Sequence, residues 1–168
     1  MEGAVRKKPL ETRERILDAA EDVFNARGVS RTTLNEIAEA AGVTRGAIYW
    51  HFKNKVELFE AMCDRVRGPM KALVEKTADK DTEDPLEQLS AGHENLMQGI
   101  IDNPHYRKVL NILFHKCEYT DESDAIVIQQ KEWQTYCNSM IQNTLSNAQL
   151  RKQLPEDLDI GLASRLMG

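Results

Sequence analysis

The feature that most constrains this chain is the stretch from Leu34 to Lys55, where two helix-start signals stand close together. Thr33 is a suitable N-cap for a first helix, and Glu36 three residues later completes a capping box. Gly42 ends this helix, because glycine adopts the left-handed conformation that reverses the backbone. Thr44 is a second N-cap. The pattern predicts a helix-turn-helix whose second helix projects far enough to enter the major groove of DNA.

The second of these helices is expected to present its polar and aromatic side chains outward. Ile48 falls on the inward face and Phe52 just beyond it. Arg45, in the first turn, suits the O6 and N7 atoms of guanine, and the hydroxyl of Thr44 suits a phosphate. The predicted DNA contacts are Thr33, Thr44, Arg45, Gly46, Ala47, Tyr49, Trp50, His51 and Lys55.

A second interpretation of the aromatic residues is that they form the core of a three-helix unit. We favour that interpretation for Phe52. For Tyr49 and His51 we favour exposure, because a soluble protein rarely exposes Tyr, Trp and His together on one helix without a partner. Thr33 is needed as a cap whatever the function is.

The distribution of charge is consistent with a DNA-binding head on an acidic body. The whole chain has a net charge of −5. Residues 1–55 hold ten Lys and Arg against eight Asp and Glu, a balance of +2, and the remainder holds twelve against nineteen, a balance of −7. Only the head has to meet phosphates.

The N-terminal part predicts a tail followed by one covering helix. Arg6, Lys7 and Lys8 form a basic tail expected to be disordered when free, and two interpretations stay open: an arm that reaches DNA, or a solvated terminus. A helix is expected over residues 12–27, because apolar residues recur at helical spacing and Gly28 supplies a stop.

The helix that leaves the head is expected to begin after Asn54, with Glu57 completing its capping box. Gly68-Pro69 predicts a kink or an end near Arg67, because proline removes a donor and clashes one turn back. If this is a kink, it is a place where the body can alter the angle of the head. Residues 77–84 are almost wholly polar and predict a surface loop.

The body is expected to contain three or more amphipathic helices and no strand, which makes the chain all-α. Asp84 and Pro85 open a helix that stops at Asn103-Pro104. A second carries Val109, Leu110, Leu113, Phe114 and Cys117 and is broken at residues 120–122. A long helix follows over residues 124–150, and an eighth starts at Asp157 or Asp159. The expected inward residues of the first and third of these helices are Leu86, Leu89, His93, Leu96, Met97 and Ile100, and Ile126, Trp133, Cys137, Met140, Ile141 and Leu145.

The run from Gly42 to Lys55, preceded by Thr12-Arg13 and by residues 24–28, closely resembles the DNA-binding domain of TetR-family repressors. Within that family the chain is similar to the AcrR-like branch that controls multidrug efflux pumps, and the run 112–118 is similar to the ligand-binding domain of that branch. The resemblance implies a helix-turn-helix DNA-binding domain at residues 1–55 and an antiparallel helical ligand-binding and dimerisation domain at 56–168. It implies a homodimer that binds a palindromic operator and is released by a hydrophobic small-molecule inducer, without a cofactor.

The same resemblance implies the ligand-binding residues. Carried over position by position, they are Val66, Leu96, Leu110, Leu113, Phe114, Cys137 and Ile141. Periodicity alone does not separate such a cavity from a packed core, and the branch varies at these positions, so the sequence does not identify the ligand.

Other chemistry is mostly excluded. The sequence shows no paired metal-ligand spacing, no Gly-x-Ser-x-Gly elbow and no phosphate-binding glycine loop, so we expect neither a metal site nor an enzyme. Two alternatives stay open: a DNA-binding regulator that senses oxidation of Cys63, Cys117 or Cys137, and a helical protein-interaction module. Buried apolar thiols, which we expect, would be inert.

The ends of the chain carry two further expectations. The start lacks the apolar segment of a signal peptide and no stretch approaches a membrane span, so a cytoplasmic protein is expected. The sequence stops at Gly168, just into the eighth helix, whereas the resemblance implies further helices that build the dimer. We expect either a domain that is incomplete at its C-terminus, which we favour, or dimerisation through other surfaces. Exposed Leu162 and Leu166 would then make the protein prone to associate.

Overall fold

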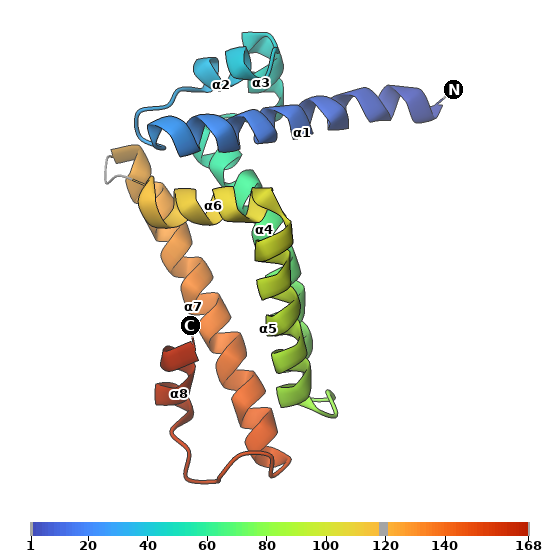
Figure 1. The fold of residues 1–168 in the computed structure, drawn as a ribbon, viewed down its shortest axis with the longest axis vertical. Coiled ribbons are helices and arrows are strands. Elements are labelled where there is room, and N and C mark those ends of the chain that lie inside the picture. The colour runs from blue at the N-terminus through green and yellow to red at the C-terminus, as the bar shows by residue number, and fades with distance from the viewer. Residues whose placement is uncertain (1, 118–120, 168) are drawn as a thin grey trace. The chain divides into compact units, whose positions relative to one another are not determined.

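The computed structural model describes the backbone of residues 2–117 and 121–167, and side chains within residues 9–117 and 125–167. Across these ranges the chain forms eight α-helices and no strand, which confirms the all-α prediction (Figure 1). The helices are α1 (Glu2–Arg27), α2 (Leu34–Ala40), α3 (Arg45–His51), α4 (Lys55–Ala78), α5 (Pro85–Asp102), α6 (Pro104–His115), α7 (Asp121–Leu150) and α8 (Ile160–Met167).

The helices group into two compact units. The first contains Met1–Val66 and Asn103–Val127, and the second contains Arg67–Asp102 and Ile128–Gly168. Packing therefore places α6 with the three N-terminal helices. The functional division predicted at residues 55/56 is a different kind of boundary and stays a prediction.

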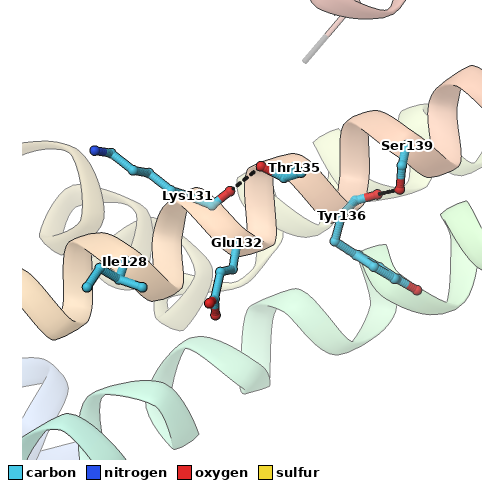
Figure 2. A pocket seen from close by; sticks show the side chains of 6 residues that line it. All are labelled: Ile128, Lys131, Glu132, Thr135, Tyr136 and Ser139. Atoms are coloured by element: carbon cyan, nitrogen blue, oxygen red, sulfur yellow. Dashed lines mark hydrogen bonds between the residues drawn. The ribbon is translucent and has the colours of Figure 1, made fainter.

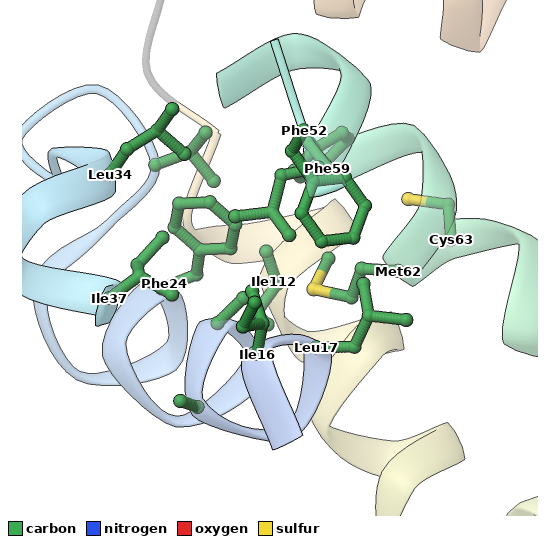
Figure 3. Packing of buried hydrophobic residues seen from close by; sticks show 14 of the residues in the cluster. Ile16, Leu17, Phe24, Leu34, Ile37, Phe52, Phe59, Met62, Cys63 and Ile112 are labelled. Atoms are coloured by element: carbon green, nitrogen blue, oxygen red, sulfur yellow. The ribbon is translucent and has the colours of Figure 1, made fainter. Parts of the chain in front are cut away.

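The first unit is built around an apolar core from α1, α2, α3, α4 and α6. Phe24 and Phe59 meet edge to face, with ring centroids 6.0 Å apart (Figure 3). Ile48 and Phe52 are buried, as the helical spacing predicted, and Ile112 brings α6 into the same core. Burial of these large side chains holds two seven-residue helices that are too short to persist alone.

A polar seam joins α1 and α6 beside this core. Lys108 Nζ lies 2.5 Å from the carboxylate of Asp22, and Asn111 Nδ2 donates to Asn25 Oδ1 at 2.6 Å. The backbone N–H of Val29 donates to the carbonyl of Lys116 at 3.0 Å, so the end of α6 is tied to the loop that follows α1.

Polar contacts in the second unit join α7 to the later part of α4 and to α8. Tyr136 Oη donates to Glu75 at 2.6 Å, which raises the pKa of the phenol to about 12. Thr144 Oγ1 donates to Thr77 Oγ1 at 3.2 Å, and Gln142 Nε2 donates to Ser164 Oγ at 3.1 Å. No helix in the described part of the chain is long and apolar enough to cross a membrane.

The start of α1 differs from the prediction. The helix begins at Glu2 instead of near residue 12, and Pro9 lies inside it. Pro9 is the eighth residue of α1, so it removes one backbone hydrogen bond and crowds the carbonyl four residues earlier, and the helix continues through it. The side chains of the basic residues 6–8 lie outside the described residues, and the two interpretations of the tail stay open.

Of the kink or end predicted near Arg67, the end is wrong and the kink stays a prediction. α4 runs without interruption from Lys55 to Ala78 through Pro69. Its apolar side continues beyond the proline, where Val74 is buried, and this packing outweighs the single lost hydrogen bond.

Several predictions about side-chain direction need correction. His93 and Met97, expected to face inward, are exposed, and so is Phe114, whose side chain is 75% exposed. Asp159 is confirmed as the cap of α8, since its carboxylate accepts from the N–H of Leu162 at 2.9 Å. Of the predicted break at 120–122, residue 120 lies outside the described backbone, and α7 has already begun at 121.

Candidate nucleic-acid interface

The two helix starts of the helix-turn-helix are built as the sequence predicts. The hydroxyl of Thr33 accepts from the N–H of Glu36, and the carboxylate of Glu36 accepts from the N–H of Thr33 at 2.8 Å, which completes the capping box. This bond to the Thr33 backbone, together with the Thr33 hydroxyl and Arg27, lowers the pKa of Glu36. Thr44 Oγ1 accepts from the N–H of Ala47 at 3.2 Å and caps α3.

The turn between α2 and α3 is a Schellman motif. Gly42 has φ +63°, its N–H donates to Glu39 at 3.0 Å, and the N–H of Val43 donates to Ala38 at 3.0 Å. This is the pair of bonds that closes a helix on a left-handed residue. Gly42 therefore lies at a bend, as predicted.

A side chain from α1 completes the turn. Arg15 Nη2 donates to the carbonyl of Ala41 at 2.7 Å and lies 3.3 Å from the carbonyl of Gly42. These carbonyls come from the end of α2, where a positive group is also favoured by the helix dipole.

The outer face of α3 is open to solvent. Tyr49 is 44% exposed and Trp50 is 72% exposed, while Arg45 and Gly46 are exposed as well. The guanidinium of Arg45 lies 5.6 Å from the centroid of the Tyr49 ring, a cation–π arrangement that orients it on the helix surface. Exposed aromatic and cationic groups on a short projecting helix form a surface suited to a polyanion.

His51, at the end of α3, packs partly inward. Its ring stacks edge-on against Trp50, with centroids 4.6 Å apart. Desolvation, followed by the charge of Arg13, lowers the pKa of His51 below its ordinary value of 6.5. A neutral imidazole at pH 7 offers one donor and one acceptor.

Lys55, predicted as a phosphate contact, has a structural role. Its side chain is almost buried, and Nζ donates to the carbonyls of Ser30 at 3.0 Å and Thr32 at 2.9 Å. The residue thus secures the loop between α1 and α2 to the start of α4. A phosphate contact in addition to these bonds stays a prediction.

Comparison with known proteins decides the family. The family model described as "Bacterial regulatory proteins, tetR family" matches residues 16–62, and a model described as "MAATS-type transcriptional repressor, C-terminal region" matches residues 84–167, half of the chain. This chain belongs to the TetR family. The chain is therefore a helix-turn-helix DNA-binding transcriptional regulator and not an enzyme, whereas the DNA contacts predicted on the exposed face of α3 stay a prediction.

Named relatives of this TetR-family chain cover nearly its whole length. The HTH-type transcriptional regulator TtgR of Pseudomonas putida is 40% identical over 162 residues, which are 96% of this chain and 77% of TtgR. The regulator AcrR of Shigella flexneri is 35% identical over 99% of this chain and 78% of AcrR.

Solved structures are similarly close. NalD, the secondary repressor of the MexAB-OprM multidrug efflux pump in Pseudomonas aeruginosa, matches with a TM-score of 0.81 and 34% identity, covering 96% of this chain and 80% of NalD. A SmeT–triclosan complex matches with a TM-score of 0.84 and 34% identity, covering 92% of this chain and 74% of SmeT. SmeT is the repressor of the Stenotrophomonas maltophilia efflux pump SmeDEF.

The predicted ligand-binding residues are distributed between the two compact units. Val66, Leu110, Leu113 and Phe114 belong to the first unit, and Leu96, Cys137 and Ile141 to the second. Val66 is buried in the core of the first unit and Leu113 packs against it. The ligand-binding role of the seven residues stays a prediction.

Two surface hollows occur within the units, and each has its own lining. One, of about 440 Å³, belongs to the second unit and is lined by residues of α7 alone (Figure 2); these residues are Ile128, Lys131, Glu132, Thr135, Tyr136 and Ser139. The other, of about 320 Å³ in the first unit, is lined by Glu14, Asp18, Arg65, Val66, Asn103, His105 and Tyr106. Val66 is the single predicted ligand residue that lines either of these two hollows.

The second hollow contains an ionic cluster that sequence reasoning missed. Arg65 of α4 donates to Asp18 at 2.7 Å and to Glu21 at 2.8 Å, and His105 Nδ1 lies 2.5 Å from Glu21, which is fully buried. Desolvation lowers the pKa of Arg65, and hydrogen bonds to Asp18, Glu14 and Glu21 outweigh it, so the net pKa is raised. The one available signal was an acidic residue on the apolar side of α1, four positions after Leu17.

The cysteines do not resemble reactive thiols. Cys63 is fully buried, and Cys117 and Cys137 are partly buried. Desolvation raises the pKa of Cys137, against a smaller opposing effect of Arg67. Raised pKa values disfavour the thiolate that reacts with oxidants.

Proposed function

We propose that this chain is a ligand-responsive repressor of a multidrug efflux operon. It binds a palindromic operator as a homodimer in the cytoplasm, and hydrophobic small molecules release it. The observation that carries the proposal is the exposed Arg45–Tyr49–Trp50 face of α3 in a chain whose relatives NalD and SmeT are efflux-pump repressors.

The DNA step of the proposal follows from the geometry of α3. Its N-terminal end carries Arg45, whose guanidinium can pair with a guanine in two hydrogen bonds. Thr44 presents a hydroxyl and a helix N-terminus to the phosphate backbone, and Trp50 offers an apolar surface to sugar or a thymine methyl. A dimer would place two such helices about 34–36 Å apart, in successive major grooves.

The ligand step is supported by relatives and by composition. SmeT has been solved with triclosan, a hydrophobic molecule, and the seven predicted ligand residues of this chain are apolar or soft side chains that suit such a compound. Because an inducer acts only through a difference in affinity between two states, the bound ligand has to weaken DNA binding by a measurable factor.

The experiment that tests the proposal is a gel-shift with DNA from upstream of the gene for this protein and its neighbours. A retarded protein–DNA complex is expected at low protein concentration, and triclosan or a similar hydrophobic drug is expected to dissociate it. Steep loss of binding with added salt is expected of phosphate contacts, whereas an apolar protein interface weakens much less. An affinity that does not change with salt concentration would argue against phosphate contacts and favour the alternative of a protein-interaction module.

A further inference from the structure

The turn of the helix-turn-helix is fastened to α1 by one side chain. Arg15 lies on α1, and its Nη2 reaches the carbonyls of Ala41 and Gly42 at 2.7 and 3.3 Å. The Schellman bonds satisfy the carbonyls of Ala38 and Glu39, three and two residues before Ala41. Arg15 therefore donates to the carbonyls at the bend itself, which accept no hydrogen bond from the Schellman motif.

This contact joins α1 to the turn that leads into α3, the proposed recognition helix. Gly42 is followed after one residue by Thr44, the N-cap of α3. The turn has φ +63° at Gly42, and a Cβ built there would lie 3.3 Å from Arg15 Nη2, so the guanidinium packs closely on the face that glycine leaves open. A planar guanidinium can hold two carbonyls at a fixed angle, which a lysine ammonium on a flexible stem does not.

We infer that Arg15 is a positioning residue for operator recognition: it sets the angle at which α3 leaves the turn, and thereby whether Arg45 meets a base edge. This rests on the proposed function, because it takes sequence-specific DNA binding as given. Arg15 acts on specificity through Ala41 and Gly42, and it does not contact the base.

A role in aligning α3 can be distinguished from a simple electrostatic contribution of the positive charge of Arg15 to DNA binding. A cation that only neutralises a phosphate contributes equally to every DNA sequence and adds about one unit to the salt slope. A residue that only aligns α3 contributes to the operator and little to unrelated DNA, because non-specific binding does not depend on the register of base contacts.

The test uses the full chain and an operator selected by the wild-type protein from a random duplex library. Fluorescence anisotropy then gives the affinity of each variant for this operator and for a scrambled duplex of the same length, over a range of salt concentrations. The variants are Arg15→Met, Arg15→Lys and, as a matched control, Arg31→Met, which removes the same charge near the other end of α2.

Loss of alignment at one base contact is expected to weaken operator binding by roughly tenfold in both Arg15 variants. Binding of the scrambled duplex should change by no more than about twofold, with a nearly unchanged salt slope. Arg31 is exposed just before α2, and if it meets only the phosphate backbone, Arg31→Met should weaken the binding of both duplexes by the same factor. If Arg15→Met is too unstable to measure, Arg15→Lys carries the comparison, because it keeps the charge and most of the stem.

Two results would overturn the inference. One is an equal loss on both duplexes in Arg15→Met, with the salt slope lower by about one unit, which would make Arg15 a phosphate contact. The other is wild-type behaviour of Arg15→Lys, which would show that charge alone suffices. A wild-type protein that selects no sequence at all would instead contradict the proposed function.

Discussion

Arg45 is the residue whose exposure and orientation most directly favour base recognition. Arg45→Ala is expected to cost roughly 1–3 kcal/mol of operator affinity and to relax the preference at one base position. Anisotropy with operators changed at single positions measures both effects. A loss of affinity of the same size on every DNA sequence would show that Arg45 contacts a phosphate and does not read a base.

If His51 meets a phosphate, as predicted, DNA binding should depend on pH. The free protein holds this imidazole at a pKa below 6.5, and a nearby phosphate would stabilise the protonated form. Binding then takes up a proton, so affinity is expected to rise as pH falls from about 7 toward 5, and to be flat above that window.

The control for this pH effect is His51→Gln, which cannot titrate. Affinity measured across the same pH range should lose its slope in this variant. An unchanged slope would assign the proton to another group.

Lys55 is expected to matter for stability. Lys55→Met leaves the carbonyls of Ser30 and Thr32 without this donor and should lower the free energy of unfolding by roughly 1–3 kcal/mol. Lys53→Met, an exposed lysine two residues earlier, is the matched control and should change little. Urea unfolding compares the two, and equal stabilities would contradict the structural role.

Whether Lys55 also contacts a phosphate, as the sequence predicted, can be tested separately from its effect on stability. If the ammonium meets a phosphate as well, the salt slope of Lys55→Met falls by about one unit on every sequence. A loss of stability with an unchanged salt slope would show that Lys55 acts only through its hydrogen bonds to the loop between α1 and α2.

At the scale of elements, Arg65 holds α4 against α1. Removing it leaves the buried carboxylate of Glu21 with His105 alone, and stranding one member of a buried ion pair costs roughly 3–5 kcal/mol at the upper limit. Because the Arg65 side chain is 21% exposed, we expect about half of that for Arg65→Met.

The comparison for Arg65 is Lys108→Met, which breaks the more exposed pair with Asp22. That loss should stay below about 1 kcal/mol. Thermal or urea unfolding that ranks the two variants equally, or in reverse, would contradict the assignment of the α1–α4 contact to Arg65.

Local signals predicted the starts of α2 and α3, and tertiary contacts account for features that no local signal indicated. The caps at Thr33 and Thr44 each depend on residues within one turn, so the sequence is sufficient to find them. Arg15 and Ala41 are 26 positions apart, and no local pattern indicates that they meet. Pro69 misled the prediction of an end to α4 because proline weakens a helix locally, whereas packing is decided by the surrounding fold.

At the scale of the whole molecule, the exposure of the outer face of α3 was predictable from the sequence, whereas the presence of a ligand cavity was not. Exposure of Tyr49 follows from the period of a single helix. A cavity depends instead on how side chains from several helices fill the space between them, which the residue types of Leu110 or Cys137 alone do not determine.

The exposed apolar side chains of α8 predict self-association. Leu162 is 50% and Leu166 is 79% exposed. The double variant Leu162→Gln, Leu166→Gln is expected to reduce association in light scattering at high protein concentration, since it removes the apolar area that drives contact. A clean monomer for the unaltered chain at the same concentration would contradict this.

The bond from the Val29 N–H to the Lys116 carbonyl has a practical consequence for mutational scanning. Both of its atoms belong to the main chain, so a library that exchanges side chains at every position would pass over it, with proline at 29 as the exception. An amide-to-ester replacement at this peptide group would weaken the bond while leaving every side chain in place, and it would report the value of a connection that, apart from proline at 29, no exchange of side chains removes.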